Sequence, residues 1–261
     1  MTLLVDSHIH VYPCYRRAEA FSILMDRLAR IDGQAEKIAC LTERHDCDFY
    51  GELLESPGKV LGDRFDTAVH SDGAYLRITR HTDGQQLVLL PGRQVVARER
   101  LEVIALNQGE FIADGSPATE IIEMVIARGG VPMLPWSPGK WFFERGRIVA
   151  ELLDRFTPAD LLIGDTSLRP RGWPTPRLMG KARRLGYSIV AGSDPLPFPG
   201  EEVYFGAYIT RIANAPAGPP ADRIRRILGN SDLSVTLLGT RPSPFAIARR
   251  LHKNAAAKRK S

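Results

Sequence analysis

Apolar runs of strand length alternate along this chain with segments in which apolar residues recur every three or four positions, as on one face of a helix. Residues 3–5 predict a short buried strand, and the spacing of Phe21, Leu24 and Leu28 predicts the helix after it. Further strands are predicted at residues 131–134, 161–163 and 188–191. Repeated strand–helix units with short connections favour parallel strands, either in a barrel or in an open sheet.

The middle of the chain has a different pattern. Residues 75–79, 87–90 and 101–106 are apolar runs of strand length, and Asp83-Gly84 marks a turn between the first two. Closely spaced strands of this kind predict antiparallel hairpins inserted between the strand–helix units. Because no linker divides the chain, we expect a single domain over residues 1–252 and a basic flexible tail over residues 253–261.

The composition is that of a folded protein, since 44% of the 261 residues are hydrophobic. No apolar run reaches the length of a membrane span, and the first residues lack the zones of a signal peptide, so we expect a cytoplasmic protein without a membrane partner. The net charge is +5, but the predicted tail supplies much of the excess. The remaining sequence shows no basic face with interleaved aromatic residues, which argues against nucleic acid as a partner.

Two histidines follow the first predicted strand. His8 and His10 are two residues apart, so in an extended chain they point to the same side and present their imidazoles together. Asp194 follows the strand at 188–191, and the carboxyl ends of parallel strands meet at one face. The sequence therefore predicts a divalent metal site from His8, His10 and Asp194, although an Asp after a strand also commonly caps a turn.

A third group of polar residues follows the second predicted strand, at residues 38–41. Glu43 and His45 alternate there, so both could face the predicted metal site. A carboxylate or an imidazole in this place could act as the general base for a water molecule, and Asp194 could take that part instead of binding the metal. We therefore treat Asp194, Glu43 and His45 as candidate catalytic residues.

The order of these motifs resembles that of the polymerase and histidinol phosphatase (PHP) superfamily of metal-dependent phosphoesterases. Residues 5–10 resemble its opening His-x-His strand, and residues 41–46 resemble its Thr-Asp-His segment. Three later stretches are similar to its Gly-x-Glu, Ala-His-Pro and Gly-Ser-Asp-x-His motifs, namely residues 92–94, 130–138 and 185–194. The resemblance implies a distorted (β/α)7 barrel of TIM type, here with the hairpin region inserted.

This chain departs from the family pattern at several ligand positions. Gln94 stands where the family has a bridging Glu, Trp136 and Leu196 stand where it has His, and Arg44 stands where its second-strand His is expected. The resemblance then implies a reduced set of ligands, with Gln94 as a supplement to the two histidines and the aspartate. Such a set can hold one zinc, manganese or iron ion.

Several residues near the predicted strand ends could bind a substrate. Arg44, Arg16 and Arg169 each follow a predicted strand, and a guanidinium matches the geometry of a phosphate group. Trp136 could stack on a ring of the ligand. Arginines in loops are more often solvated surface groups, and a tryptophan there more often covers the core. With the resemblance, these residues favour a small phosphorylated molecule as the partner.

Three functions remain open at this point. The first is a metal-dependent hydrolase of PHP type that acts on a phosphate ester with a reduced, mononuclear site. The second is a catalytically degenerate PHP-like domain with a binding or structural role. The third is a hydrolase of amides or lactones with one metal ion. The content of bound metal separates the second from the other two.

Overall fold

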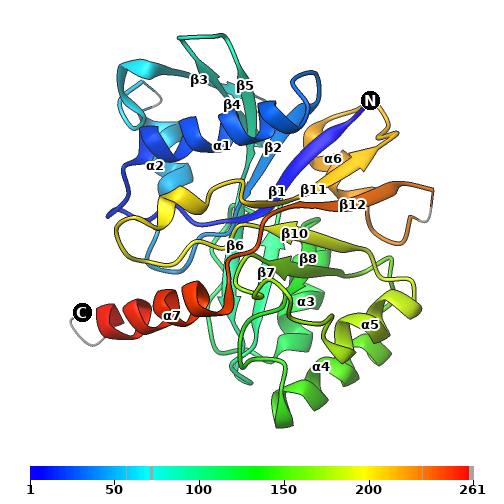
Figure 1. The fold of residues 1–261 in the computed structure, drawn as a ribbon. Coiled ribbons are helices and arrows are strands. Elements are labelled where there is room, and N and C mark those ends of the chain that lie inside the picture. Colours follow the sequence, from blue (N-terminus) through cyan, green and yellow to red (C-terminus); the bar gives the residue numbers. More distant parts are fainter. Residues whose placement is uncertain (57, 71–72, 231, 259–261) are drawn as a thin grey trace.

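Two mixed β-sheets form the centre of the protein in a computed structural model, which describes residues 1–56, 58–70, 73–230 and 232–258 (Figure 1). The larger sheet consists of β1 (Leu3–Ile9), β2 (Glu36–Leu41), β3 (Phe65–His70), β4 (Tyr75–Arg80), β5 (Gln86–Leu90), β11 (Tyr208–Ala213) and β12 (Ser234–Gly239). The smaller sheet consists of β6 (Gly92–Val96), β7 (Glu102–Leu106), β8 (Val131–Pro135), β9 (Leu162–Thr166) and β10 (Ile189–Gly192). The strand orders are β12-β11-β1-β2-β5-β4-β3 and β10-β9-β8-β7-β6.

Seven helices accompany these sheets in the described part of the chain. They are α1 (Arg17–Ile31), α2 (Phe49–Glu55), α3 (Ala118–Ala127), α4 (Phe143–Arg155), α5 (Arg177–Arg184), α6 (Pro220–Arg225) and α7 (Pro244–Lys258). Two short 3-10 turns, η1 (Gly62–Arg64) and η3 (Glu201–Tyr204), complete the elements used below. Residues 253–258 of the predicted tail continue α7, and its residues 259–261 lie outside the described part.

The expected (β/α)7 barrel is wrong. β1, β2 and β5 are parallel to one another, as are β8, β9 and β10, but β7 runs antiparallel to both β6 and β8. β11 likewise pairs antiparallel with β1. Within the described residues, the strands therefore form two separate sheets rather than one closed barrel. Antiparallel pairing in the hairpin region is found for β4 with β5 and for β6 with β7. The sequence missed the division into two sheets because a buried apolar run does not show which strands lie beside it.

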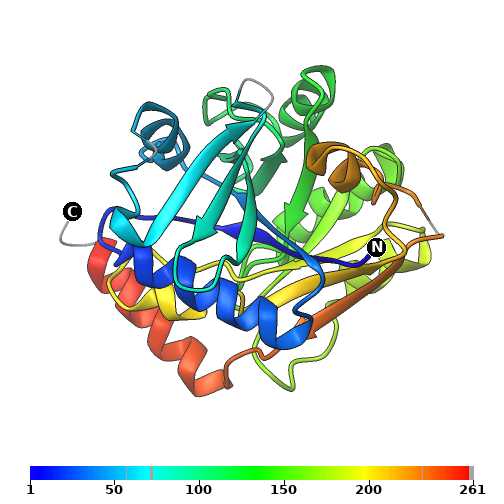
Figure 2. The same ribbon diagram turned by 90° about the horizontal axis from the view of Figure 1, so that it is seen from above.

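Three apolar layers stabilise this arrangement. Residues such as Leu3, Val5 and Met133 fill the space between the two sheets. On the outer face of the larger sheet, α1 buries Phe21 and Leu24. Helices α3, α4 and α5 cover the outer face of the smaller sheet, and Figure 2 shows the layers from above. Each helix therefore presents one apolar stripe to a sheet, as its sequence period requires. No helix of the described residues has the length and apolar content to cross a bilayer.

A β-bulge in β1 decides which way the histidines point. The pairing of β1 with β2 shifts in register between Asp6 and Ile9. Before the shift, Leu4 faces the outer layer, and after it Ile9 joins that same layer although five positions separate the two residues. A bulge changes the alternation of side chains in this way. It turns His8 and His10 to the inner side of the strand.

Candidate metal centre

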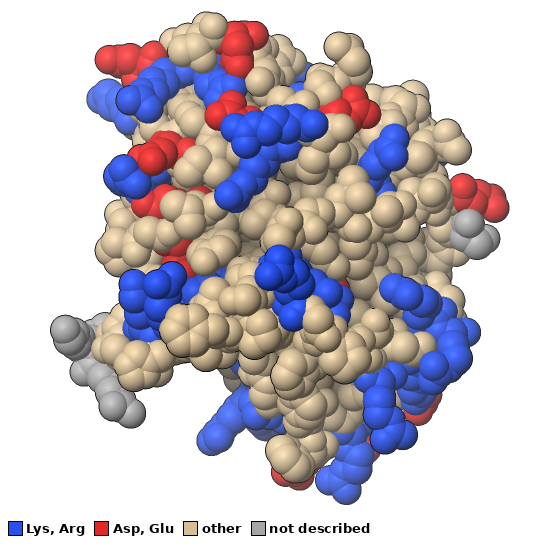
Figure 3. All heavy atoms as spheres, in the orientation of Figure 1, with Lys and Arg blue, Asp and Glu red and all other residues tan. Residues whose placement is uncertain are grey.

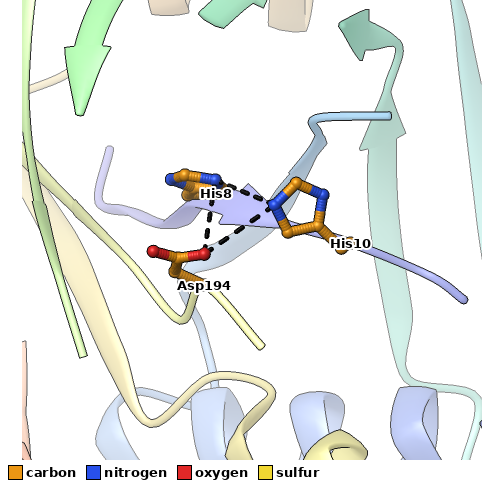
Figure 4. A group of neighbouring side chains, drawn as sticks. All are labelled: His8, His10 and Asp194. Atoms are coloured by element: carbon orange, nitrogen blue, oxygen red, sulfur yellow. Dashed lines mark hydrogen bonds and ion pairs between the residues drawn. The ribbon is translucent and has the colours of Figure 1, made fainter. Parts of the chain in front are cut away.

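Three side chains from distant parts of the sequence meet where β1 and β10 end. His8 Nε2 lies 3.1 Å from His10 Nε2, and Asp194 Oδ1 lies 3.6 Å and 3.8 Å from these two nitrogens (Figure 4). Ligands about 2.1 Å from a tetrahedral ion are about 3.4 Å apart. All three residues are buried. The structure thus brings together a ligand set whose spacing suits a divalent metal ion.

The tautomer of His10 is set by Thr42. The Thr42 hydroxyl donates to the backbone oxygen of Ile9 at 3.1 Å, so its oxygen can accept the N–H of His10 Nδ1 at 3.4 Å. With the proton on Nδ1, Nε2 keeps a free lone pair toward His8 and Asp194. This is the arrangement in which a histidine binds a metal through one nitrogen and is oriented through the other.

Burial and nearby charges favour the uncharged imidazole of His10. Desolvation lowers its pKa well below the usual value, and His8, Arg44 and Lys140 lower it further by electrostatic repulsion. Burial also raises the pKa of Asp194, while the positive charges near it, including Arg250 and Lys140, oppose this rise. A cation between the three groups would favour the ionised form of Asp194 in the same way.

The backbone fixes Asp194 against β1. Its N–H donates to the backbone oxygen of His8 at 2.8 Å, and the residue has a φ of +47°, which few residues other than glycine adopt. Gly192 lies so close to β1 that an added Cβ would stand 2.2 Å from the Cβ of His8. Only glycine at 192 permits this approach of the two strands.

Asp6 links β1 to the loop that follows β10 and carries Asp194. Its fully buried carboxylate accepts hydrogen bonds from the N–H groups of Ser193 at 2.8 Å and Gly206 at 3.0 Å, and from the Ser193 hydroxyl. The N–H of His8 completes the set at 3.3 Å. Asp6 therefore holds the residue before Asp194 and the first histidine in one network. The residue stands two places before His8, but periodicity gave no sign of this role.

Glu43 and His45 do not join the three ligating residues. β2 ends at Leu41, and the Glu43 carboxylate accepts the N–H groups of Phe49 at 2.5 Å and Tyr50 at 3.3 Å, which begin α2. Burial raises the pKa of Glu43 to about 7 although Arg93 and these N–H groups oppose the rise. His45 is more than half exposed and lies 3.5 Å from Asp114. The alternation expected of a strand does not apply to residues outside it.

Gln94 contacts Glu102, which forms an ion pair with Lys140. Its Nε2 donates to Glu102 Oε1 at 3.3 Å, and Lys140 forms an ion pair with the same carboxylate. The positive charge of Lys140 and the negative charge of Glu102 act on the pKa of Asp194 in opposite directions, so this pair contributes to the electrostatics of the metal centre. Lys140 belongs to residues 136–142, which connect β8 to α4, and the sequence gave no reason to select it.

The predicted arginines have different surroundings. Arg44 pairs with Asp46 at 3.0 Å and lies over the ring of Tyr12, which in turn stacks on His10. Arg44 therefore contributes positive charge beside the site. Arg16 is largely exposed and its ion pairs are with Glu19 and Glu202.

Arg169 is buried and bound to a carboxylate. Two of its nitrogens bond to Asp165, at 2.8 Å for Nε, and a third donates to the backbone oxygen of Trp173 at 3.0 Å. Trp136 is also buried, within the apolar layer beneath α3 and α4. Leu196, where the family has its last His, is buried in an apolar cluster beside α7.

Helix α7 contributes a further residue that the sequence did not indicate. Arg250 is 2% exposed, binds the Glu201 carboxylate at 2.6 Å and donates to the backbone oxygen of Asp194 at 3.4 Å. Its guanidinium also lies 3.8 Å from the ring centre of Tyr204. Arg250 therefore ties the last helix to the loop that carries Asp194.

Comparison with protein-family models gives no match, and comparison with curated protein sequences gives none either. The structure is similar to the crystal structure of PsfC from Pseudomonas syringae PB-5123, with a TM-score of 0.62 and 17% identity over 98% of this chain and 99% of that one. It is also similar to the lesion-specific endonuclease PfuEndoQ from Pyrococcus furiosus, with a TM-score of 0.53 and 14% identity. The match covers 93% of this chain and 60% of the endonuclease. At such identities the likeness shows a shared fold.

A second structure of endonuclease Q corrects one expectation. That protein is seen with a 27-mer duplex substrate that has an abasic lesion at the active site, and it matches this chain with the same TM-score of 0.53, 14% identity and coverage. Because a protein of this fold takes a DNA duplex as substrate, the argument from sequence against nucleic acid as a partner is wrong. A binding face depends on which charges and aromatic residues the fold gathers from distant segments, and their order along the chain does not show this.

Proposed function

We propose that this protein is a metal-dependent hydrolase of phosphate esters, a divergent relative of the PHP superfamily with a mononuclear metal centre at His8, His10 and Asp194. The observation that carries the proposal is the convergence of two imidazole nitrogens and one carboxylate oxygen at 3.1 to 3.8 Å in a buried site. The shared fold with an endonuclease supports hydrolysis of a phosphate ester in particular.

The residues of the site fit a zinc, manganese or iron ion. When bound, such an ion acts as a Lewis acid and lowers the pKa of a coordinated water to about 7. His8 and His10 would hold it through Nε2, with Asp194 as the third ligand. Thr42 keeps the His10 proton on Nδ1. Lys140 and Arg44 supply positive charge beside the site, where the oxygens of a phosphate group would be bound.

The replaced ligands favour one alternative, a domain that binds its ligand without hydrolysis. Trp136 and Leu196 lie in apolar clusters, and the Gln94 amide bonds to Glu102. Neither Trp nor Leu offers a metal ligand, so these positions cannot supply the further ligands that the family pattern has there. The alternative predicts a pocket that binds phosphate compounds but turns none over.

Metal analysis of the purified protein tests the proposal. We expect close to one divalent ion per chain by elemental analysis, and loss of that ion in His8→Ala and His10→Ala. His81→Ala is the matched control, because His81 is an exposed histidine paired with Asp66. Hydrolysis of bis(p-nitrophenyl) phosphate and p-nitrophenyl phosphate should follow the metal content. Less than about 0.2 ion per chain in every preparation would contradict the proposal, and a bound ion without turnover would favour the binding domain.

A further inference from the structure

A groove of about 870 Å³ lies between α4, α5 and the loop that follows β9. The same residues 136–142 that carry Lys140 toward Glu102 contribute Trp141 and Phe142 to this groove. The groove is thus at the end of the smaller sheet where β8 and β9 have their carboxyl ends. In Figure 3, Lys and Arg residues gather over α4 and α5 on the lower right of the molecule.

The aromatic residues at this groove are unusually exposed. Phe143 is 97% exposed, Trp173 is 47% exposed and Phe142 is 42% exposed. Phe143 also has a φ of +54°, a strained conformation for a residue with a side chain. Large apolar side chains held in solvent together mark a surface that binds a partner. The strained backbone of Phe143 also indicates a binding surface, because such strain does not stabilise the fold.

Two hydrogen bonds hold the backbone of Trp173 in place. Arg169, fixed by Asp165, donates to the Trp173 backbone oxygen, and the Trp173 N–H donates to Pro170 at 3.0 Å. Pro174 follows directly and restricts the chain further. The indole is therefore presented from a rigid support. This contact also gives the buried Arg169 a function that a solvated loop arginine would not have.

The charges of the groove have one sign. Its charged lining residues are Arg147, Arg177, Lys181 and Arg184. Among the described residues, no carboxylate lines the groove. Arg177 and Arg184 are exposed and form no ion pair with any described side chain. Two unpaired guanidiniums in an aromatic groove suit a ligand that carries repeated negative charges and flat rings.

We propose that this groove binds a single-stranded stretch of nucleic acid. The bases stack on Trp173 and Phe143, and the phosphates contact Arg177 and Arg184. Sequence-tolerant binding of single strands combines these two features, a basic track and aromatic platforms. A single strand offers a negative charge and a flat ring at every nucleotide, which matches both features of the groove, whereas a second copy of this chain would bring the same positive charges together. The proposal goes beyond the proposed function, since strand binding here needs no metal.

Fluorescence anisotropy with a labelled 15-nucleotide oligothymidylate tests the proposal, in EDTA so that the metal centre has no part. We expect Arg177→Glu with Arg184→Glu to weaken binding at least tenfold. Arg30→Glu with Arg64→Glu makes the same change of charge on exposed arginines of α1 and η1, and should leave binding within twofold. Each phosphate contact adds about 0.7 to the salt dependence of single-strand binding, so the groove variant should lose about 1.4.

Stacking is tested separately from charge. Of the three tryptophans, Trp173 is exposed, whereas Trp136 and Trp141 are 2% and 6% exposed. Strand binding should therefore quench the tryptophan fluorescence of the wild type and leave that of Trp173→Leu unchanged. A fully abasic strand of equal length should bind at least tenfold more weakly than oligothymidylate. Equal affinity for both strands, equal loss in the groove and control variants, or self-association through Phe143 without strand binding would each overturn the proposal. Metal content and phosphate ester hydrolysis would be unaffected by any of these outcomes.

Discussion

The candidate metal centre and the aromatic groove lie at the ends of neighbouring strands, yet they are built in opposite ways. At the centre, His8 and His10 are at most 3% exposed, and backbone hydrogen bonds join β1 to the loop after β10. At the groove, Phe143 and Trp173 extend into solvent from loop ends. A metal site needs ligands held within a fraction of an ångström, and recognition of a flexible strand needs accessible surface.

This difference has a consequence for how each region responds to substitution. Residues of the centre are also part of the interior, so changing them affects stability and chemistry together. The exposed side chains of the groove, such as Phe143 and Trp173, contribute little buried area, so changing them affects binding more than stability. Measurements of stability, metal content and strand binding in selected variants test that contrast.

The largest effect is expected at Gly192. A Cβ at this position would overlap His8, so Gly192→Ala should lower the free energy of unfolding by about 3 kcal/mol and remove the metal as well. Urea unfolding and elemental analysis measure both. Gly33→Ala is the control, since a Cβ there has its nearest neighbour at 3.7 Å and should change neither quantity. Full stability and full metal content in Gly192→Ala would break the contrast.

The next effect is a dependence of stability on pH. Burial raises the pKa of Asp6 from 3.8 to about 6, against the opposing hydrogen bonds from Ser193, Gly206 and His8. Between about pH 4 and 6 the folded chain keeps a proton that the unfolded chain has released, so this contribution to stability is lost as the pH rises. The change is about 3 kcal/mol for a shift of about two units.

Urea unfolding between pH 4 and 8 measures this slope. In Asp6→Asn the free energy of unfolding should fall less steeply between about pH 4 and 6. Burial raises the pKa of Glu43 to about 7, so Glu43 should continue to lower the free energy of unfolding up to that pH in both proteins. An unchanged slope in Asp6→Asn would show that the Asp6 carboxyl group does not hold a proton in the folded protein.

A smaller effect is expected at Thr42. Thr42→Val keeps the shape of the side chain but removes the hydroxyl that faces His10 Nδ1, so metal affinity should fall about 10- to 100-fold while the fold is retained. Titration against a chelator of known affinity measures the change. Thr67→Val is the matched control, because the Thr67 hydroxyl is buried without a hydrogen-bond partner in the described part of the chain. Equal affinities in the two variants would remove Thr42 from the site.

The smallest effect on stability is expected in the groove, and its sign is reversed. Phe143→Gly should raise the free energy of unfolding by about 1 kcal/mol, because glycine adopts the positive φ without strain. Binding of oligothymidylate should weaken in the same variant. Phe245→Gly, at an exposed position of α7, should instead destabilise by a similar amount through helix propensity. Destabilisation in both variants would show that Phe143 contributes to folding.

The sequence predicted part of the site because some of its geometry is local. The side chains of His8 and His10 share one side of the chain, as their spacing requires, and Asp194 meets them because parallel β9 and β10 end near β1. The bulge between Asp6 and Ile9, which decides the side, depends on pairing with β2 and has no mark in the sequence.

Other features depended on direction and distance that a pattern does not contain. The apolar runs did not reveal which strands lie side by side, and so one barrel was predicted where β1, β2 and β5 belong to one sheet and β8, β9 and β10 to another. Glu43 lies beyond the end of β2, where period-two alternation no longer holds. The basic and aromatic surface combines residues 140–147 with residues 171–184, two stretches that are far apart along the chain. Each of them contains tryptophan together with Lys or Arg, but only the fold places them side by side.

Residues 136–142, which connect β8 to α4, have one side toward Glu102 and another along the groove. One face directs Lys140 to Glu102 beside the metal centre, and the other places Trp141 and Phe142 along the groove. Any insertion or deletion in this short connection displaces both faces at once. Lengthening this connection to accept a different ligand would therefore also reposition Lys140, so that a change of ligand and a change of charge at the centre would come together.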